Sequence, residues 1–360
     1  MSLLYYCRTC YAENDGIIQH EQEVVAVAVI AGHGGYVPLY RIDRADIAEQ
    51  HGGRGRGETA VPGRDENHVT MASEAAETAI DRSGTDPEEL GAVVSASITD
   101  PFAEHGIAAH VAYRLGATGD VRTGDFRASG RAATDALAFA AEYADATDAP
   151  ALLVAADIMP VEEGHDDEAH SGSGAGALVI APDGSSSVAS IEALGAETSG
   201  FVERHRLHGE AAVPGDGSFE GDDGFGAAVE AATTRALSDA GIDSPDRAVI
   251  AAHDARMASG AASGFSDATH DSTFDQVGYA GAATFALDLV SALENADAGE
   301  TAIAVAYGPG GADAIALEIE EPTSQEGLSI AELLDSKEYV TYAKHLEYRE
   351  RVDYQGVTVA

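Results

Sequence analysis

The stretch RAATDALAFAAEYADATDAPALLVAADI, residues 131–158, decides the fold because it occurs a second time, as GAATFALDLVSALENADAGETAIAVAYG at residues 281–308. Ala133-Thr134 of the first copy aligns with Ala283-Thr284 of the second. In each copy a helix of small residues leads through a loop into a fully apolar strand. Helices that alternate with buried strands are typical of a mixed sheet covered on both faces.

A second pair of matching segments occurs in the same order, at residues 79–98 and 236–254. Gly84 and Gly241 stand where each helix is expected to end, and a glycine just past a helix is its usual left-handed cap. Two matched blocks in one order indicate an internal duplication. We expect a glycine-rich hairpin into a further strand after each apolar strand, at SGSGAGALVIA (residues 171–181) and GPGGADAIALEI (residues 308–319).

The duplication predicts an α/β fold of five layers, αβαβα, with alanine-rich helices held between two sheets. The helix expected at residues 132–144 is apolar almost all round, which suits a buried central layer.

The composition is strongly acidic, with 62 Asp and Glu against 20 Lys and Arg, a net charge of −42. The acids are scattered and the apolar runs between them are intact, which excludes a disordered acidic tail. A folded protein coated with carboxylates is typical of a salt-loaded cytosol, where charge repulsion is screened, and we therefore infer a halophilic source. No basic face is available for nucleic acid or for an anionic membrane. No segment approaches the length of a membrane span and no secretory signal is visible, so we expect a cytoplasmic location.

Four segments together resemble the archaeal 3-hydroxy-3-methylglutaryl-CoA synthases of the thiolase superfamily: GHGGYVPLYRID at 32–43, VTMASEAAETAI at 69–80, YGPGGADAIALEI at 307–319 and KEYVTYAKHLEYR at 337–349. The resemblance covers roughly residues 24–351. It implies the thiolase-like fold, with an N-terminal extension at 1–23, thiolase-like halves at 24–181 and 182–322, and a helical tail at 323–360.

Members of that family condense acetyl-CoA with acetoacetyl-CoA, using a cysteine nucleophile, a glutamate acid/base and a histidine that orients the thioester. The resemblance places the cysteine position on Ala128, within DFRASGRAAT at residues 125–134. The glutamate position falls on Ile98, and an asparagine position falls on Val277. Only the histidine is retained, as His253 after an apolar strand, where it is either catalytic or an inherited polar core residue. Alanine cannot form the acyl-enzyme that a thiol forms.

Other polar residues lie near these positions. Ser129 follows Ala128, but the next residue on a helix points about 100° away, so we favour a first-turn serine without a catalytic role. Asp100 and Glu104 are close to Ile98 in sequence without occupying the matched site.

The resemblance also suggests residues for holding a ligand. Arg127 and Arg131, at i and i+4, are expected on one helix face, where they either hold a carboxylate or phosphate or pair with surrounding acids. A glycine turn at Gly308, Gly310 and Gly311 is a further candidate for ligand contact. Phosphates of CoA meet basic residues in relatives, and the candidates here are Arg54, Arg56, Arg204 and Arg206.

Cys7 and Cys10 are the only cysteines and form a single CxxC. Three readings stay open: a partial zinc site completed by a second chain, with His20 and His33 nearby; a redox-active pair; or an extension without function, which we favour.

The leading hypothesis is a catalytically degenerate subunit that keeps the fold, requires no cofactor and serves as a scaffold or binds CoA or an acyl-CoA. The fold implies a homodimer or a heterodimer with another thiolase-fold subunit, and the resemblance adds a thiolase and a zinc-ribbon protein as partners. The rival hypothesis is an active acyl-CoA acyltransferase or condensing enzyme that uses His253 with Ser129 or another non-cysteine group. A redox or metal module built on Cys7 and Cys10 is the third.

Overall fold

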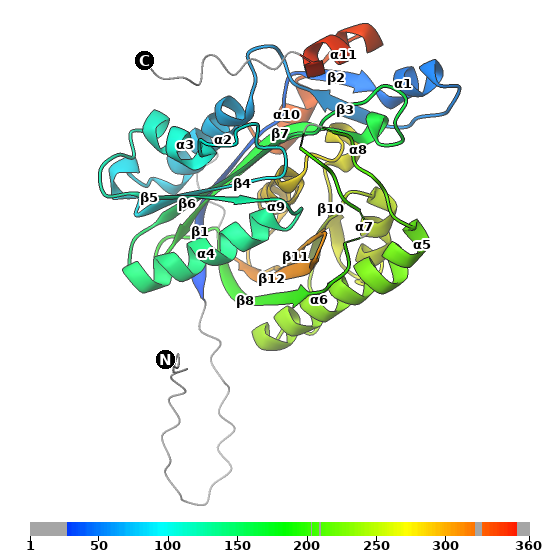
Figure 1. Ribbon diagram of the computed structural model, residues 1–360. Coiled ribbons are helices and arrows are strands. Elements are labelled where there is room, and N and C mark those ends of the chain that lie inside the picture. Colours follow the sequence, from blue (N-terminus) through cyan, green and yellow to red (C-terminus); the bar gives the residue numbers. More distant parts are fainter. Residues whose placement is uncertain (1–26, 203, 209, 321–325, 351–360) are drawn as a thin grey trace, which may run out of the picture.

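The computed structural model describes residues 27–202, 204–208, 210–320 and 326–350. Its centre is a ten-stranded mixed sheet in the order β10-β9-β11-β12-β8-β1-β7-β6-β4-β5 (Figure 1). The five strands of the N-terminal half are β1 Ala28–Tyr36, β4 Ala92–Ser97, β5 Arg122–Arg127, β6 Ala151–Ile158 and β7 Ser173–Ala181. Those of the C-terminal half are β8 Ala189–Thr198, β9 Arg247–Ala251, β10 Thr269–Asp271, β11 Thr301–Gly308 and β12 Gly311–Ile319.

The two halves repeat one strand topology. In the N-terminal half β4 lies parallel between β5 and β6, and in the C-terminal half β9 lies parallel between β10 and β11. The remaining neighbours are antiparallel, and β1 meets β8 over only three residue pairs, Ala28–Ile30 against Ala189–Ile191. This short contact joins two five-stranded units edge to edge while the rest of each unit diverges. The predicted duplication is therefore confirmed in the sheet.

Helices form three layers around these strands (Figure 1). The central layer holds α4 Ala132–Thr147 and α9 Ala282–Asn295, the outer layer of the N-terminal half holds α2 His68–Ser83 and α3 Ile107–Leu115, and that of the C-terminal half holds α6 Ala227–Ala240 and α7 Ala255–Ala262. Each layer has its own apolar cluster of buried side chains. The αβαβα fold expected from the sequence is confirmed.

The expected helix ends are also confirmed at Gly84 and Gly241. Gly84 caps α2 at a φ of 68° and Gly241 caps α6 at a φ of 70°. Both values lie in the left-handed region that a side chain opposes, so glycine is the residue that ends these helices at least cost.

The central helices differ from the expectation in their exposure. Eleven of the fourteen residues of α9 are buried, whereas α4 exposes one face that includes Asp135 and Phe139. α4 lies in the central layer as expected, but one of its faces is exposed because it packs beside β5, the strand at the outer edge of the sheet.

Only one of the two expected glycine-rich hairpins is tight. β11 runs directly into β12, with Gly308 opposite Gly311. β6 and β7 are antiparallel neighbours, but residues 159–172 separate them and include a short 3₁₀ helix, η2 Glu168–His170. This longer connection contributes part of the wall of the candidate site described below.

Shorter elements complete the fold. A small sheet, β13-β2-β3, lies with α1 and α11 at the top in Figure 1, where β3 contacts β7 and α8. The remaining elements are β2 Tyr40–Asp43, α1 Arg44–Gln50, β3 Glu58–Val61, η1 Pro87–Glu89, α5 Gly217–Phe219, the π-helical η3 Glu220–Gly226, α8 Phe274–Val277, α10 Ile330–Asp335, β13 Glu338–Tyr339 and α11 Tyr342–Glu350.

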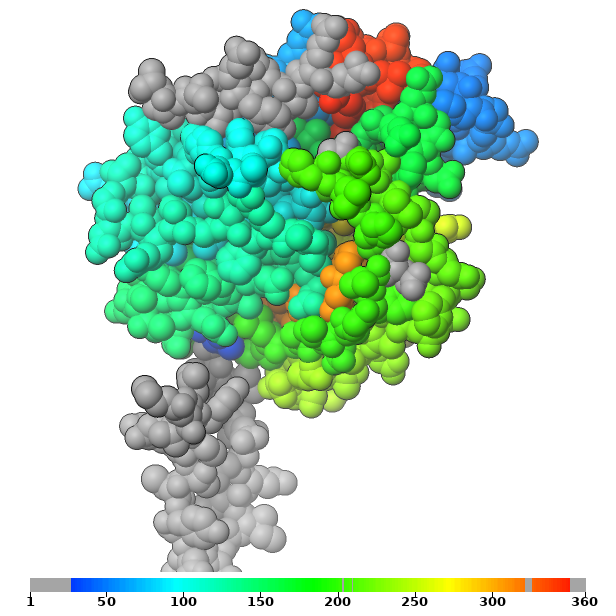
Figure 2. All heavy atoms as spheres, in the orientation of Figure 1, coloured from blue at the N-terminus to red at the C-terminus, as the bar shows by residue number. Residues whose placement is uncertain are grey.

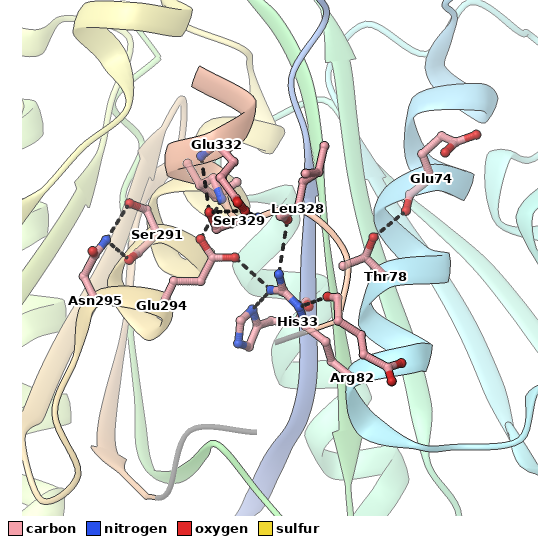
Figure 3. Close-up of polar contacts among 12 residues, drawn as sticks. His33, Glu74, Thr78, Arg82, Ser291, Glu294, Asn295, Leu328, Ser329 and Glu332 are labelled. Atoms are coloured by element: carbon pink, nitrogen blue, oxygen red, sulfur yellow. Dashed lines mark hydrogen bonds and ion pairs between the residues drawn. The ribbon is translucent and has the colours of Figure 1, made fainter. Parts of the chain in front are cut away.

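A buried arginine ties the chain before α10 to the body of the N-terminal half (Figure 3). Arg82 of α2 donates to the backbone oxygens of Glu326 and Leu328, and its Nη1 lies 2.9 Å from His33 Nδ1 and 2.8 Å from Glu294 Oε1. Glu294 of α9 in turn accepts from the backbone N–H of Ile330. Breaking a buried ion pair of this kind by removing one partner typically costs about 3–5 kcal/mol.

Among the described residues, no helix has the length and apolar character needed to cross a membrane.

Candidate ligand-binding site

A cavity of about 620 Å³ opens at the carboxyl ends of the strands, between the two halves. Its walls come from the residues after β4, the turn after β5, Met159 after β6, the loop at 202–212, Tyr279 before α9, and the ends of β9 and β11. In open α/β sheets this is the edge at which ligands bind. Figure 2 shows the hollow, where orange atoms from the end of β11 lie recessed between the cyan–teal surface of the N-terminal half and the green surface of the C-terminal half.

The turn between β5 and α4 presents Ala128 to this cavity. Ala128 is exposed and has a φ of 74°, one of only three positive values at a non-glycine residue in the described chain. An L-residue with a side chain opposes this conformation by about 1–2 kcal/mol, and such strain is concentrated at functional sites. The position matched to the family's nucleophile is thus a strained turn that carries a methyl group.

Ser129 lies in the same turn and not on a helix, since α4 begins at Ala132. Its Oγ donates to Pro309 O at 3.2 Å and accepts from Arg131 N at 3.3 Å. Both hydrogen bonds hold the turn together, and neither joins Ser129 to His253.

The other two matched positions differ in their placement. Ile98 lines the cavity, directly after β4. Val277 is fully buried at the end of α8, within the central apolar cluster, and is not part of the cavity wall. Of the acids near Ile98, Asp100 lines the cavity and is buried, while Glu104 is exposed outside it.

His253 stands where the sequence places it, two residues after β9, and lines the cavity. Burial, reinforced by the nearby charge of Arg204, lowers the pKa of His253 to about 4, so its imidazole is neutral at pH 7. A buried carboxylate, Glu220 of η3, has Oε1 3.7 Å from His253 Nε2. Glu220 also hydrogen-bonds Tyr307, and burial together with this carboxylate raises the pKa of the Tyr307 phenol.

Arg127 and Arg131 do not share a helix face, because Arg127 ends β5 and Arg131 is the N-cap of α4. Arg127 lines the cavity and lies 2.7 Å from Asp100 Oδ2. Arg131 is turned away from the cavity and makes a bidentate pair with Asp313, through Nε at 2.9 Å and Nη2 at 2.8 Å. Each guanidinium is thus paired with an acid of the chain.

The glycine turn has one member at the cavity. Gly308 lines it, whereas Gly310 accepts a hydrogen bond from Arg131 and Gly311 packs beside Glu197 O.

The CxxC pair falls outside the described residues, as does His20. His33 lies in β1 and is held by Arg82, and burial lowers its pKa to about 3. Within the described part of the chain, no three His, Cys, Asp or Glu side chains are grouped so as to hold a metal ion.

No family model matches the sequence. A hydroxymethylglutaryl-CoA synthase of Thermococcus gammatolerans is 35% identical over 185 residues, which is 50% of this chain and 53% of that protein. One of Methanothermobacter thermautotrophicus is 29% identical over 347 residues, or 91% of this chain and 99% of that protein. The crystal structure of the HMG synthase of the curacin biosynthetic pathway superposes with a TM-score of 0.75 at 18% identity, covering 90% of this chain and 88% of that one. In sequence and in fold the chain resembles the hydroxymethylglutaryl-CoA synthases.

The first alignment spans about half the length of the relative and the second nearly all of it. The fold of this hydroxymethylglutaryl-CoA synthase-like chain therefore extends over both halves.

The loop at 202–212 carries residues that the sequence named only as unplaced candidates. Arg204 and Arg206 both line the cavity, whereas Arg54 and Arg56 are exposed in the connection between α1 and β3, away from it. Arg204 lies 2.8 Å from Asp167 Oδ2.

Sequence reasoning missed Glu220 altogether. It stands at the start of EGDDGFG, an acidic and glycine-rich stretch that reads as a loop. The structure forms a π-helix there, a rare element that often occurs at functional sites. No pattern in the sequence reveals that this one acid of the stretch is buried against His253.

Proposed function

We propose that this chain is a non-condensing member of its family, which binds a CoA thioester in the cavity without forming an acyl-enzyme. The observation that supports this proposal best is the turn at Ala128. The turn keeps the left-handed backbone and the exposure that a nucleophile needs, yet it carries a methyl group. The CoA ligand is suggested by a relative whose crystal structure is an HMG-CoA synthase complexed with CoA.

The surroundings of Ala128 support the same conclusion. The position matched to the acid/base glutamate is Ile98, whose side chain can neither donate nor accept a proton. Cys7 and Cys10 are the only thiols of the chain, and both belong to its first ten residues. A condensing reaction through a thioester link has no nucleophile at the matched position.

The test is covalent labelling with radiolabelled acetyl-CoA. The wild type is expected to bind the ester reversibly, to carry no label outside residues 1–23 and to release no CoA above background. Ala128→Cys is expected to gain a covalent acetyl label at residue 128, because the turn already holds a side chain in the required conformation. Ser129→Cys, one residue along the same turn, is the matched control and is expected to gain none. CoA release by the wild type that is lost in His253→Ala would overturn the proposal.

The second candidate function is an active acyl-CoA enzyme, and the contact between Glu220 and His253 favours it. A carboxylate 3.7 Å from an imidazole nitrogen is able to orient the ring and stabilise its charged form during proton transfer. The labelling experiment separates the two functions, since an enzyme of this kind loses CoA release in both His253→Ala and Glu220→Gln.

We further propose that the chain pairs through β5, with a second copy of itself or with another thiolase-fold subunit. β5 is the outermost strand on its side of the sheet, and Phe139 of α4 is 41% exposed beside it. An open edge strand flanked by an exposed aromatic is a ready surface for a second sheet. Arg122 N donates toward β4, so alternation directs the N–H of Thr123 outward. Thr123→Pro is therefore expected to lower the molar mass measured by light scattering from that of a dimer to that of a monomer, whereas Thr123→Ser leaves it unchanged.

The acidic surface supports a third proposal, that the protein works in a concentrated-salt cytoplasm. With a net charge of −42, the folded chain is under strong self-repulsion at low ionic strength. The melting temperature is expected to rise steeply as KCl increases from about 0.1 M to 1 M, the range over which the screening length falls from about 10 Å to 3 Å. A melting temperature that stays flat over this range would contradict the proposal.

A further inference from the structure

A second cavity, of about 660 Å³, lies in the outer helical layer of the C-terminal half, between η3 and α6 on one side and α7 on the other. We call it the outer cavity. Among the described residues, it shares no lining side chain with the cavity of the candidate site. Phe225 lines the outer cavity and packs edge to face on Tyr307, which lines the other, with the ring centroids 5.1 Å apart. The two cavities are therefore separate spaces with a pair of aromatic rings between their walls.

The wall of the outer cavity consists mainly of glycines and apolar side chains. Those side chains belong to the apolar cluster of the outer layer, and they are Phe225, Val229, Leu237, Met257, Ala261 and Phe265. Phe225 and Val229 are buried, whereas the other four are only partly covered by protein. Both the volume of the outer cavity and its apolar character match those of sites that bind small molecules.

Two glycines on opposite walls keep this space open. Gly260 lies within α7 and Gly221 within η3, and glycine stabilises the interior of a helix less than alanine does. Neither glycine has a positive φ, and a Cβ on either would meet no atom of the described chain within 4 Å. Neither the backbone conformation nor crowding therefore requires glycine at these two positions. Its effect there is to leave room for a molecule between the helices.

Thr233 of α6 is the buried polar group of the wall. Its side chain lines the outer cavity and is 5% exposed, and its hydroxyl has no hydrogen-bond partner in the described chain. A buried hydroxyl in this state is uncommon and destabilising, because the hydrogen bonds that it makes with water in the unfolded chain are not replaced. An oxygen of a bound molecule would supply the partner that the chain does not.

The charged groups of the wall are both acidic. Asp222 and Glu230 are exposed and line the outer cavity, and no Lys, Arg or His of the described chain lines it. A carboxylate or phosphate that entered this cavity would lose its hydration and meet two like charges. The outer cavity therefore disfavours CoA and its esters, which carry phosphates, and favours an uncharged molecule.

We propose that the outer cavity binds an uncharged and largely apolar small molecule that carries a hydroxyl or carbonyl oxygen, and that the hydroxyl of Thr233 is its hydrogen-bond partner. This site lies apart from the cavity of the proposed function and does not depend on it. The molecule is bound intact, and no bond is made or broken.

The test compares three probes of the same chain length, which are 1-octanol, octanoate and octylammonium. Dissociation constants are measured by titration calorimetry with the full chain at one fixed KCl concentration. The wild type is expected to bind 1-octanol at a single site, and roughly tenfold more tightly than octanoate, because the outer cavity offers the anion no cation. Octylammonium is also expected to bind more weakly than 1-octanol, because its charge loses hydration in an apolar space.

Gly260→Leu tests where 1-octanol binds. The new side chain fills the outer cavity, so this variant is expected to lose detectable binding of 1-octanol. Its melting temperature is expected to rise, because leucine stabilises a helix interior more than glycine does, and this rise shows that the variant is folded. Gly217→Leu is the matched control. A Cβ on Gly217 also meets no atom of the described chain within 4 Å, but Gly217 does not line the outer cavity, so its variant is expected to keep the wild-type affinity.

Thr233→Val tests the hydrogen bond, since valine keeps the shape of threonine and removes the hydroxyl. This variant is expected to bind 1-octanol about fivefold more weakly than the wild type does. Its affinity for toluene, which has no oxygen, is expected to stay unchanged, and this shows that the outer cavity remains open. Equal weakening of 1-octanol and toluene would assign Thr233 to packing and contradict its role as a hydrogen-bond partner.

Four further outcomes would overturn the proposal. The first is a wild-type titration with 1-octanol that shows no binding, and the second is undiminished binding in Gly260→Leu, which would place the probe elsewhere. The third is tighter binding of octanoate or octylammonium than of 1-octanol. The fourth is a molar mass, measured by light scattering, that falls from dimer to monomer in Gly260→Leu alone, because a second copy of the chain would then fill the outer cavity.

Discussion

The turn before α4 and the turn before α9 occupy the same place in the two halves. The first is open to the cavity, whereas the second is closed by other parts of the protein. Aligned through Ala133 and Ala283, Ala128 corresponds to Gly278. Both residues have a positive φ, 74° and 86°. A Cβ on Gly278 would lie 2.7 Å from His170 O, so that position is closed by protein. Ala128 is open to the cavity.

The starts of α9 and α4 also differ in how closely a carboxylate approaches the helix backbone. Asp157, from the N-terminal half, accepts directly from the backbone N–H of Ala282 at the start of α9. Asp313, from the C-terminal half, reaches the start of α4 only through the side chains of Arg131 and Thr134. The chain therefore fills the start of α9 with its own carboxyl group and leaves the turn before α4 open to the cavity. A duplicated fold supplies two equivalent positions, and this chain uses one for structure and the other for a site.

The largest effect expected from this comparison is the loss of Asp157. Asp157→Ala leaves five donors at 2.6 to 2.9 Å without their acceptor in a fully buried position. We expect the free energy of unfolding to fall by about 5 kcal/mol. Urea unfolding followed by circular dichroism at fixed KCl measures this loss.

Asp313→Ala is the matched variant for the other helix. Arg131 keeps Gly310 O at 3.1 Å and Asp135 at 3.8 Å, so we expect a smaller loss, of about 2 kcal/mol. Equal losses in the two variants would show that the two helix starts are equivalent and would contradict the comparison.

The central helices also differ in how they hold acids, which gives a dependence on pH. Asp288 of α9 is fully buried and accepts from the N–H and the hydroxyl of Thr273 at 2.6 and 2.7 Å. Burial raises the pKa of Asp288 to about 7. Because the folded state binds this proton more tightly than the unfolded chain, its stabilisation is fully present below about pH 4 and is lost as pH rises to 7. The loss amounts to roughly 4 kcal/mol.

Asp288→Asn keeps both acceptor contacts and does not titrate. We expect this variant to lose the downward slope in unfolding free energy between pH 4 and 7, and to be more stable than the wild type at pH 8. Asp145→Asn, at an exposed acid of α4, is the control and should keep the wild-type slope. A wild-type slope that survives in Asp288→Asn would place the titration elsewhere.

Much of the fold can be predicted from the sequence. Apolar strands indicate burial, glycines mark the ends of helices, and both signals occur in each half. The strand at Ala151–Ile158 and the cap at Gly84 are examples. The exposed face of α4 could not be predicted, since an alanine-rich helix looks the same whether or not another layer covers it. The length of the β6–β7 connection was not predicted, because the apolar start of β7 does not indicate how many residues lie between the two strands.

Sequence reasoning placed the residues that line the cavity from the ends of strands and missed those that reach it from loops. Ile98 directly follows β4 and His253 lies two residues after β9, so their places at the cavity follow from the duplication. Arg206 and Glu220 reach the cavity from the irregular segment after β8, and only the folded backbone brings them there. The pairing of Arg131 with Asp313 joins residues that no local spacing connects.

The smallest expected effect tests the turn itself, through the exchange of its matched residues. Ala128→Gly removes a side chain from the left-handed region, and we expect the free energy of unfolding to rise by about 1 kcal/mol, less the entropy that glycine adds to the unfolded chain. Gly278→Ala is the reverse exchange at the closed turn. It is expected to cost about 2 kcal/mol or more, since it adds both the strain and a contact at 2.7 Å with His170 O. Thermal unfolding of both variants under one salt condition measures the pair. If Ala128→Gly stabilises the protein and Gly278→Ala destabilises it, the side chain of residue 128 lowers stability. This result is expected if residue 128 serves the cavity and not the folding of the chain. A destabilised Ala128→Gly would instead assign that methyl group to packing, and the two turns would then differ only in their surroundings.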